Sequence, residues 1–87
     1  MNKKELQDMF ELARKRDEHI LMYIDIEDYE ALEMIIVDNK NFDKKLDYID
    51  NAYDEGLKLK SNEDIQILDL DLVTHVGLME FIVNGMS

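Results

Sequence analysis

The 87-residue sequence predicts one small α+β domain, with helices packed on a small antiparallel sheet in the order α-β-β-α-β-α. The spacing of apolar residues changes along the chain between the helical period and the alternation of a strand. Short polar stretches separate these segments, and a hydrophobic content of 46% is enough for a packed core. Because this length supplies one hydrophobic core, we treat residues 1–87 as a single acidic domain.

The first half of the chain predicts a helix followed by two antiparallel strands. Asn2 can cap a helix over residues 3–17, with Glu5 completing a capping box, and its apolar stripe is Leu6, Met9, Phe10 and Ala13. After His19 the period becomes two, which predicts a strand whose alternate apolar residues are Ile20, Met22, Ile24 and Ile26. Residues 27–30 can turn, and residues 31–37 alternate as the second strand.

The second half predicts a helix, a strand and a final helix. Asn41 can cap a helix that ends near Gly56, with the apolar stripe Phe42, Leu46, Ile49, Ala52 and Tyr53. Residues 64–70, rich in isoleucine and leucine, predict a third strand. In the tail, Leu72, Val76, Met79 and Val83 fit a helix that is capped by Asp69 or Asp71 and stops at Gly85. A strand bent at Gly77 is the alternative, and we favour the helix.

Charge is strongly segregated along the chain. The formal net charge is −11, and residues 17–38 carry eight acidic side chains and no lysine or arginine. Such a field repels nucleic acid and anionic membranes, and it attracts basic protein surfaces. We therefore expect no direct nucleic-acid binding and no membrane partner.

Several kinds of chemistry are disfavoured by the residues present. Cysteine is absent, and no signal peptide or long apolar run is visible, so a reducing cytoplasm is the expected location. The acidic stretches lack the ligand spacing of a calcium loop. His19 and His75 lack a zinc-hydrolase motif and are expected at element boundaries. We expect neither a metal site, nor a cofactor, nor enzymatic activity.

Tyrosines interleaved with acids instead suggest a protein-binding surface. Aromatic rings supply buried contact area, while carboxylates meet lysine or arginine on a partner. The candidate partner-binding residues are Tyr23, Asp25, Glu27, Asp28, Tyr29, Glu30 and Glu33. A rigid array of carboxylates can also imitate the phosphates of a nucleic-acid backbone.

The stretch FDKKLDYIDNAYDEGLKLKSNEDIQIL, residues 42–68, resembles small acidic proteins of Gram-positive phages and prophages. The small acidic anti-CRISPR proteins of such phages are similar in length and charge. This resemblance implies DNA mimicry against a nucleic-acid-handling host protein such as a Cas nuclease. The alternative hypothesis is a structural or regulatory protein that self-associates as a homo-oligomer through an apolar face formed by Leu72, Val76, Met79, Phe81 and Val83.

Overall fold

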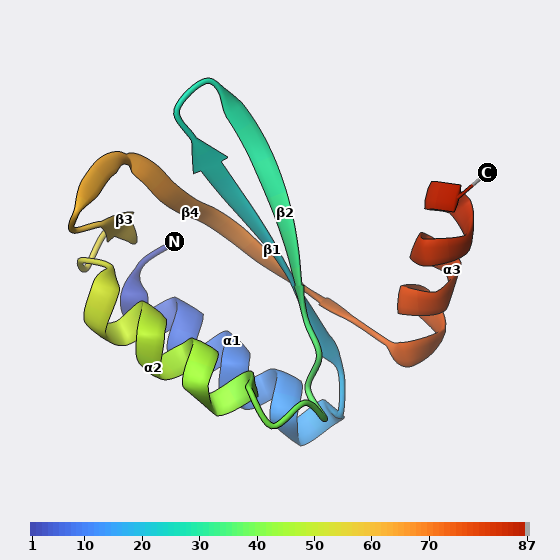
Figure 1. Ribbon diagram of the computed structural model, residues 1–87. Coiled ribbons are helices and arrows are strands. Elements are labelled where there is room, and N and C mark those ends of the chain that lie inside the picture. Colours follow the sequence, from blue (N-terminus) through green and yellow to red (C-terminus); the bar gives the residue numbers. More distant parts are fainter. Residues whose placement is uncertain (87) are drawn as a thin grey trace.

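The computed structural model describes residues 1–86, apart from the side chains of residues 81, 85 and 86. It confirms an α+β fold, and it adds one short strand to the predicted order. The elements are α1 (Lys3–Arg16), β1 (His19–Ile26), β2 (Tyr29–Ile35), α2 (Phe42–Ala52), β3 (Lys58–Leu59), β4 (Asn62–Val73) and α3 (His75–Met86). The four strands form one antiparallel sheet in the order β2-β1-β4-β3 (Figure 1).

Helix α1 begins as its sequence predicts. The side chain of Asn2 accepts a 2.9 Å hydrogen bond from the backbone N–H of Glu5, which satisfies one of the free donors in the first turn. The helix ends at Arg16, and Asp17 takes the left-handed conformation at its C-terminus. Its buried face consists of Leu6, Phe10 and Ala13.

Helix α2 starts directly after Asn41 as predicted, but its capping contact and its end differ from the prediction. Asn41 precedes the helix, but its side chain makes no capping hydrogen bond, and its backbone N–H is instead bonded to the side chain of Asn39. The helix stops at Ala52, before Gly56 is reached. The left-handed residue in this loop is Leu57, with φ of 64°, because its buried side chain anchors the loop in the core.

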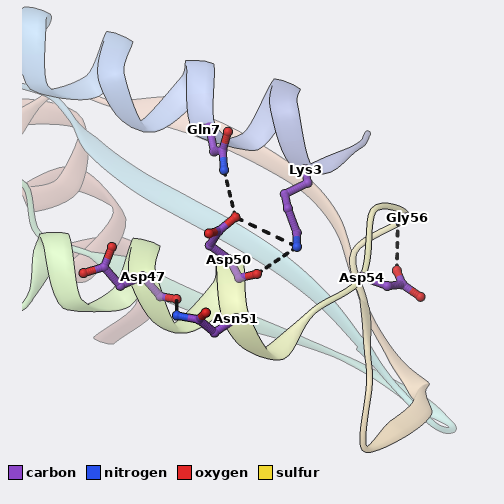
Figure 2. Close-up of polar contacts among 7 residues, drawn as sticks. All are labelled: Lys3, Gln7, Asp47, Asp50, Asn51, Asp54 and Gly56. Atoms are coloured by element: carbon purple, nitrogen blue, oxygen red, sulfur yellow. Dashed lines mark hydrogen bonds and ion pairs between the residues drawn. The ribbon is translucent and has the colours of Figure 1, made fainter.

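Helices α1 and α2 lie together on one face of the sheet (Figure 1). Their apolar contact centres on the rings of Phe10 and Phe42, whose centroids are 5.1 Å apart. At the other end of the pair, Lys3 and Gln7 both donate hydrogen bonds to Asp50, at 2.8 and 3.0 Å (Figure 2). Apolar and polar contacts therefore fix the two helices along their length.

Strands β1 and β2 form a hairpin whose loop is Glu27 and Asp28 alone. The predicted turn over residues 27–30 was too long, because Tyr29 already pairs with Ile26. The predicted second strand was also displaced, since β2 ends at Ile35 rather than at residue 37. Glu27 has a positive φ of 52°, as the tight two-residue turns of hairpins require.

Strand β4 is longer than predicted and contains a bulge. Residues 69 and 67 of β4 pair with the consecutive residues Tyr23 and Ile24 of β1, which leaves Leu68 as an extra residue. Because of this extra residue, odd-numbered residues before the bulge and even-numbered residues after it lie on the same face of the sheet. Before it Ile65 and Ile67 point toward the helices, and after it Leu70 and Leu72 do.

The start of helix α3 corrects another prediction. Asp69 and Asp71 lie inside β4 and do not cap the helix. Thr74 does so instead, because its side-chain oxygen accepts a 3.0 Å hydrogen bond from the backbone N–H of Gly77. The C-terminal segment is nevertheless a helix, as we favoured.

Helix α3 lies apart from α1 and α2, beyond the end of β4 (Figure 1). The rings of His19 and His75, which stand at the first residues of β1 and α3 as predicted, are 5.8 Å apart. Leu78 is buried. The other described apolar side chains of α3 are exposed, namely Val76, Met79, Ile82 and Val83.

Candidate protein-binding surface

The two faces of the sheet differ in chemistry. The face that packs on α1 and α2 includes Ile20, Met22, Ile67 and Leu70, all nearly inaccessible to solvent. Because side chains alternate along a strand, the intervening residues point to the opposite face. That face is the candidate surface.

We define the acidic face as Tyr23, Asp25, Glu30, Asp69 and Asp71. Tyr23 stands opposite Asp69 of β4, and Asp25 stands directly opposite Glu30 of β2. Tyr23, Glu30, Asp69 and Asp71, together with Leu68, line a shallow hollow between the strands. Leu32, opposite Tyr23, adds an exposed apolar side chain. The surface thus combines carboxylates with a ring and two leucines.

Basic side chains are absent from the strands that form this face. All ten lysines and arginines lie in α1, α2, β3 or the loops, and none lies in β1, β2 or β4. The nearest in register is Lys58 of the edge strand β3, which pairs with Gln66 in the same row as Asp25. Two strand spacings, about 10 Å, separate such positions, so Lys58 screens Asp25 only weakly.

Tyr23 is held in place by its acidic neighbours. Its hydroxyl donates a 2.8 Å hydrogen bond to Oδ2 of Asp71. This hydrogen bond raises the pKa of Tyr23 above its ordinary value of 10, with smaller contributions from burial and from the negative charges of Asp71 and Asp69. Tyr23 therefore stays neutral and presents its ring beside two carboxylates.

The structure divides the residues predicted from sequence into three groups. Tyr23, Asp25 and Glu30 come together on the acidic face. Glu27 and Asp28 form the exposed hairpin tip, where the backbone N–H of Glu27 donates to the carbonyl of Asp64. Tyr29 and Glu33 stand opposite Ile26 and Met22, on the side that carries the helices.

Among the ion pairs of the described residues, one involves a candidate, Glu33. Nζ of Lys45, on α2, lies 2.8 Å from Oε1 of Glu33. This ion pair links β2 to α2. The charge of Glu33 is therefore neutralised within the chain and is less available to a partner. Tyr29 is 63% exposed at the hairpin end, so it borders the acidic face without sharing its orientation.

Sequence reasoning missed Asp69 and Asp71 as members of this surface. The sequence predicts Asp69 or Asp71 as the cap of the last helix and ends the third strand at residue 70, whereas both are exposed residues of β4 on the acidic face. The alternation in LDLDLV, residues 68–73, was the available signal for a strand. No local pattern indicates that this strand pairs with β1.

Neither a metal centre nor a membrane span is found in the part of the chain that the structure describes. Residues 1–86 contain no cluster of three or more histidine or acidic side chains arranged to bind a metal ion. Their helices are too short or too polar to cross a lipid bilayer.

The fold and this surface define the protein as a small α+β protein with an acidic sheet face. No protein-family model matches the chain, and no curated protein and no solved structure matches it. The resemblance to small phage proteins therefore stays a prediction. We therefore base the proposed function on the geometry of the chain itself.

Proposed function

We propose that this protein is a non-enzymatic inhibitor that binds a nucleic-acid-handling protein in the host cytoplasm by DNA mimicry. Its acidic face occupies the basic groove in which the target, such as a Cas nuclease, holds DNA. The observation that carries the proposal is the pairing of Asp25 directly opposite Glu30 without a basic side chain on either strand. Like charges in this position destabilise a sheet, and a basic partner relieves that cost on binding.

The spacing of the carboxylates suits the target's lysines and arginines. Neighbouring strands place side chains about 5 Å apart, and alternate residues such as Asp69 and Asp71 lie about 7 Å apart. Charges at a spacing of a few ångströms also characterise the phosphates of a duplex. Because the carboxylates stand on a sheet, little conformational entropy is lost when they are bound.

Tyr23 and the exposed leucines supply the uncharged part of the interface. Tyr23 is oriented by Asp71, and Leu68 borders the same hollow. Apolar and aromatic contacts hold a complex together when salt screens the charges. The charges then govern the association rate and the choice of partner, as in other electrostatically steered complexes.

The first test is a pull-down from bacterial lysate with the full chain immobilised, eluted with a salt gradient and repeated with competing duplex DNA. We expect a nucleic-acid-binding protein that elutes at moderate salt and is displaced by DNA, since both compete for one basic groove. If such a protein is captured but neither salt nor DNA releases it, DNA mimicry is contradicted.

A matched pair of variants separates the acidic face from acidity in general. Asp25→Asn with Glu30→Gln removes two charges from the face, and Asp8→Asn with Glu11→Gln removes two from α1. We expect the first variant to bind the captured target roughly tenfold more weakly and the second to bind nearly as the parent chain does. Equal effects would show that only net charge matters.

Self-association is the second candidate function, and the exposure of α3 favours it. Val76, Met79 and Val83 are 67%, 50% and 60% exposed. Leu72 of the expected apolar face packs partly against the core, and the side chain of Phe81 lies outside the described residues. Light scattering tests this candidate, because a stable oligomer that Val83→Asp dissociates would support it. A monomer at high concentration would count against it.

A further inference from the structure

Among the residues that the structure describes, strand β2 forms one edge of the sheet and has no neighbour on its outer side. The strand order places β2 outermost, with β1 as its single partner, and the β1–β2 register is uninterrupted from Ile20–Ile35 to Ile26–Tyr29. Proline is absent from the chain, and no bulge is present in this pair. An uninterrupted edge strand offers its outward backbone groups to another strand.

The hairpin determines which backbone groups point outward. In a two-residue hairpin the pair beside the loop, here Ile26 and Tyr29, is hydrogen-bonded, and bonding then alternates along the strand. The bond from the N–H of Glu27 to Asp64 on β4 agrees with this alternation. Glu30, Leu32 and Met34 therefore direct their N–H and C=O groups away from β1. Within the described residues these groups have no hydrogen-bond partner.

We propose that β2 pairs with β2 of a second copy of this chain, antiparallel and centred on Leu32. In this register Leu32 faces Leu32 of the other copy, Glu30 faces Met34, and Ala31 faces Glu33. The sequence of β2 is therefore self-complementary, because every glutamate is placed opposite an apolar residue. Centres at Glu30 or at Glu33 would instead set like charges opposite each other, which destabilises paired strands.

In this register one repulsive contact remains, between the Glu33 side chains of the two copies, and an ion pair within each copy weakens it. Glu33 has Glu33 of the second copy as a diagonal neighbour, at a distance where repulsion between free carboxylates would be felt. Lys45 lies 2.8 Å from the carboxylate of Glu33 within each copy. The centre on Leu32 also pairs β2 over its whole length, whereas a centre on Ala31 leaves its last residues unpaired.

This pairing would join two sheets into one and leave both acidic faces on the same side, since the two-fold axis is perpendicular to the sheet. It uses the backbone edge of β2, which is distinct from α3, but Glu30 and Leu32 of this strand also lie on or beside the acidic face. The salt dependence is opposite to that of a basic partner. Two chains of charge −11 repel each other, so added salt strengthens the dimer.

The test combines sedimentation equilibrium with two opposite variants at Met34. Met34→Lys places an ammonium opposite Glu30 of the second copy, and we expect a dimer about fivefold tighter. Met34→Glu places a carboxylate there, and we expect a dimer weakened by a similar factor. Equal responses to the two variants, or a chain that is monomeric up to millimolar concentration in high salt, would overturn the proposal.

Amide hydrogen exchange of the parent chain gives a second readout that needs no variant. The amides of Glu30, Leu32 and Met34 should exchange rapidly in dilute solution and become protected as the concentration rises, whereas those of Ala31 and Glu33 are protected throughout. Protection that appears only in α3 would assign self-association to that helix. Protection of β2 only after adding another protein would assign the edge to a different partner. Either result would overturn pairing between copies.

Discussion

Individual residues in this protein adopt backbone conformations that their side chains disfavour. Asp17, Glu27 and Leu57 have positive φ angles, whereas the described residues include no glycine with positive φ. Asp17 ends α1, Glu27 opens the hairpin turn, and Leu57 is fully buried. Each conformation is imposed by the structure around it, which explains why Leu57 rather than Gly56 takes the left-handed conformation after α2.

We predict that Glu27→Gly stabilises the fold by about 0.5–1 kcal/mol. Glycine has no Cβ and adopts a positive φ freely, and this gain exceeds the entropy that it adds to the unfolded chain. Urea unfolding monitored by circular dichroism measures the difference. Glu27→Ala is the control, because it removes the same charge and keeps the strain. An equal gain in both variants would assign the effect to charge.

Tyr23 should ionise at an unusually high pH. The hydrogen bond to Asp71 is the main cause of its raised pKa, so we expect Asp71→Ala to lower that pKa toward 10. Absorbance of the phenolate during alkaline titration, compared with Tyr23→Phe, isolates this tyrosine from the other three. Asp25→Asn is the control, because Asp25 does not contribute to the shift.

The raised pKa of Tyr23 also determines how the stability of the fold changes at alkaline pH. A folded pKa above the unfolded value means that the folded chain holds the phenolic proton more tightly. The resulting contribution to stability is complete below pH 10 and is lost as the pH rises through the folded pKa. Asp71→Ala should reduce this alkaline loss. An unchanged titration of Tyr23 would show that its hydroxyl is not bonded to Asp71 in solution.

At the level of elements, the bulge at Leu68 is what gives the sheet one apolar and one acidic face. In a regular strand a one-residue shift moves every side chain to the other face. Ile65 and Ile67 occupy odd positions and Leu70 and Leu72 even ones, yet all four are part of the core or pack against it. The bulge therefore lets Asp69 and Asp71 join the acidic face without exposing the isoleucines.

We expect helix α3 to depend on its cap, because few of its described side chains are buried. It lies apart from α1 and α2, and among its described side chains Leu78 is the buried one. We predict that Thr74→Ala costs about 1 kcal/mol of local helix stability, because the bond to the N–H of Gly77 is lost. Faster hydrogen exchange in α3, with α1 unchanged, is the expected result. Thr74→Ser keeps the hydroxyl and should behave like the parent chain.

At the scale of the whole molecule, charge opposes folding. The net charge of −11 includes the Asp25–Glu30 pair, which no basic side chain of β1, β2 or β4 offsets. We predict that raising the salt concentration from low to near-molar stabilises the chain by about 1 kcal/mol, since salt screens the repulsion. Thermal unfolding across that range measures it, and an unchanged melting temperature would contradict it.

Removing one charge from the acidic face should also stabilise the fold. Glu30→Gln abolishes the like-charge pair, and we expect a gain of about 0.2–1 kcal/mol at low salt that shrinks at high salt. A matched loss of target binding would show that the chain keeps this repulsion for function. A gain in stability without any loss of binding would instead leave solubility as the role of these carboxylates.

The amino-acid sequence was enough to predict the elements that depend on local interactions. Apolar periodicity indicated three helices and the three longer strands, and the cap formed by the Asn2 side chain set the start of α1. Charge segregation indicated an acidic surface before any face was known. These signals are readable because helices and alternating strands are encoded by residues close together in the chain.

Which acidic residues share a surface follows from the pairing of distant strands. Asp25 meets Glu30 within a hairpin, but Tyr23 meets Asp69 and Asp71 across a distance of more than forty residues in sequence. Glu33 and Tyr29 fall on the other side of the sheet, and the two-residue strand β3 is defined by its pairing with β4. Register and bulges depend on contacts between distant segments, and no local pattern of side chains specifies them.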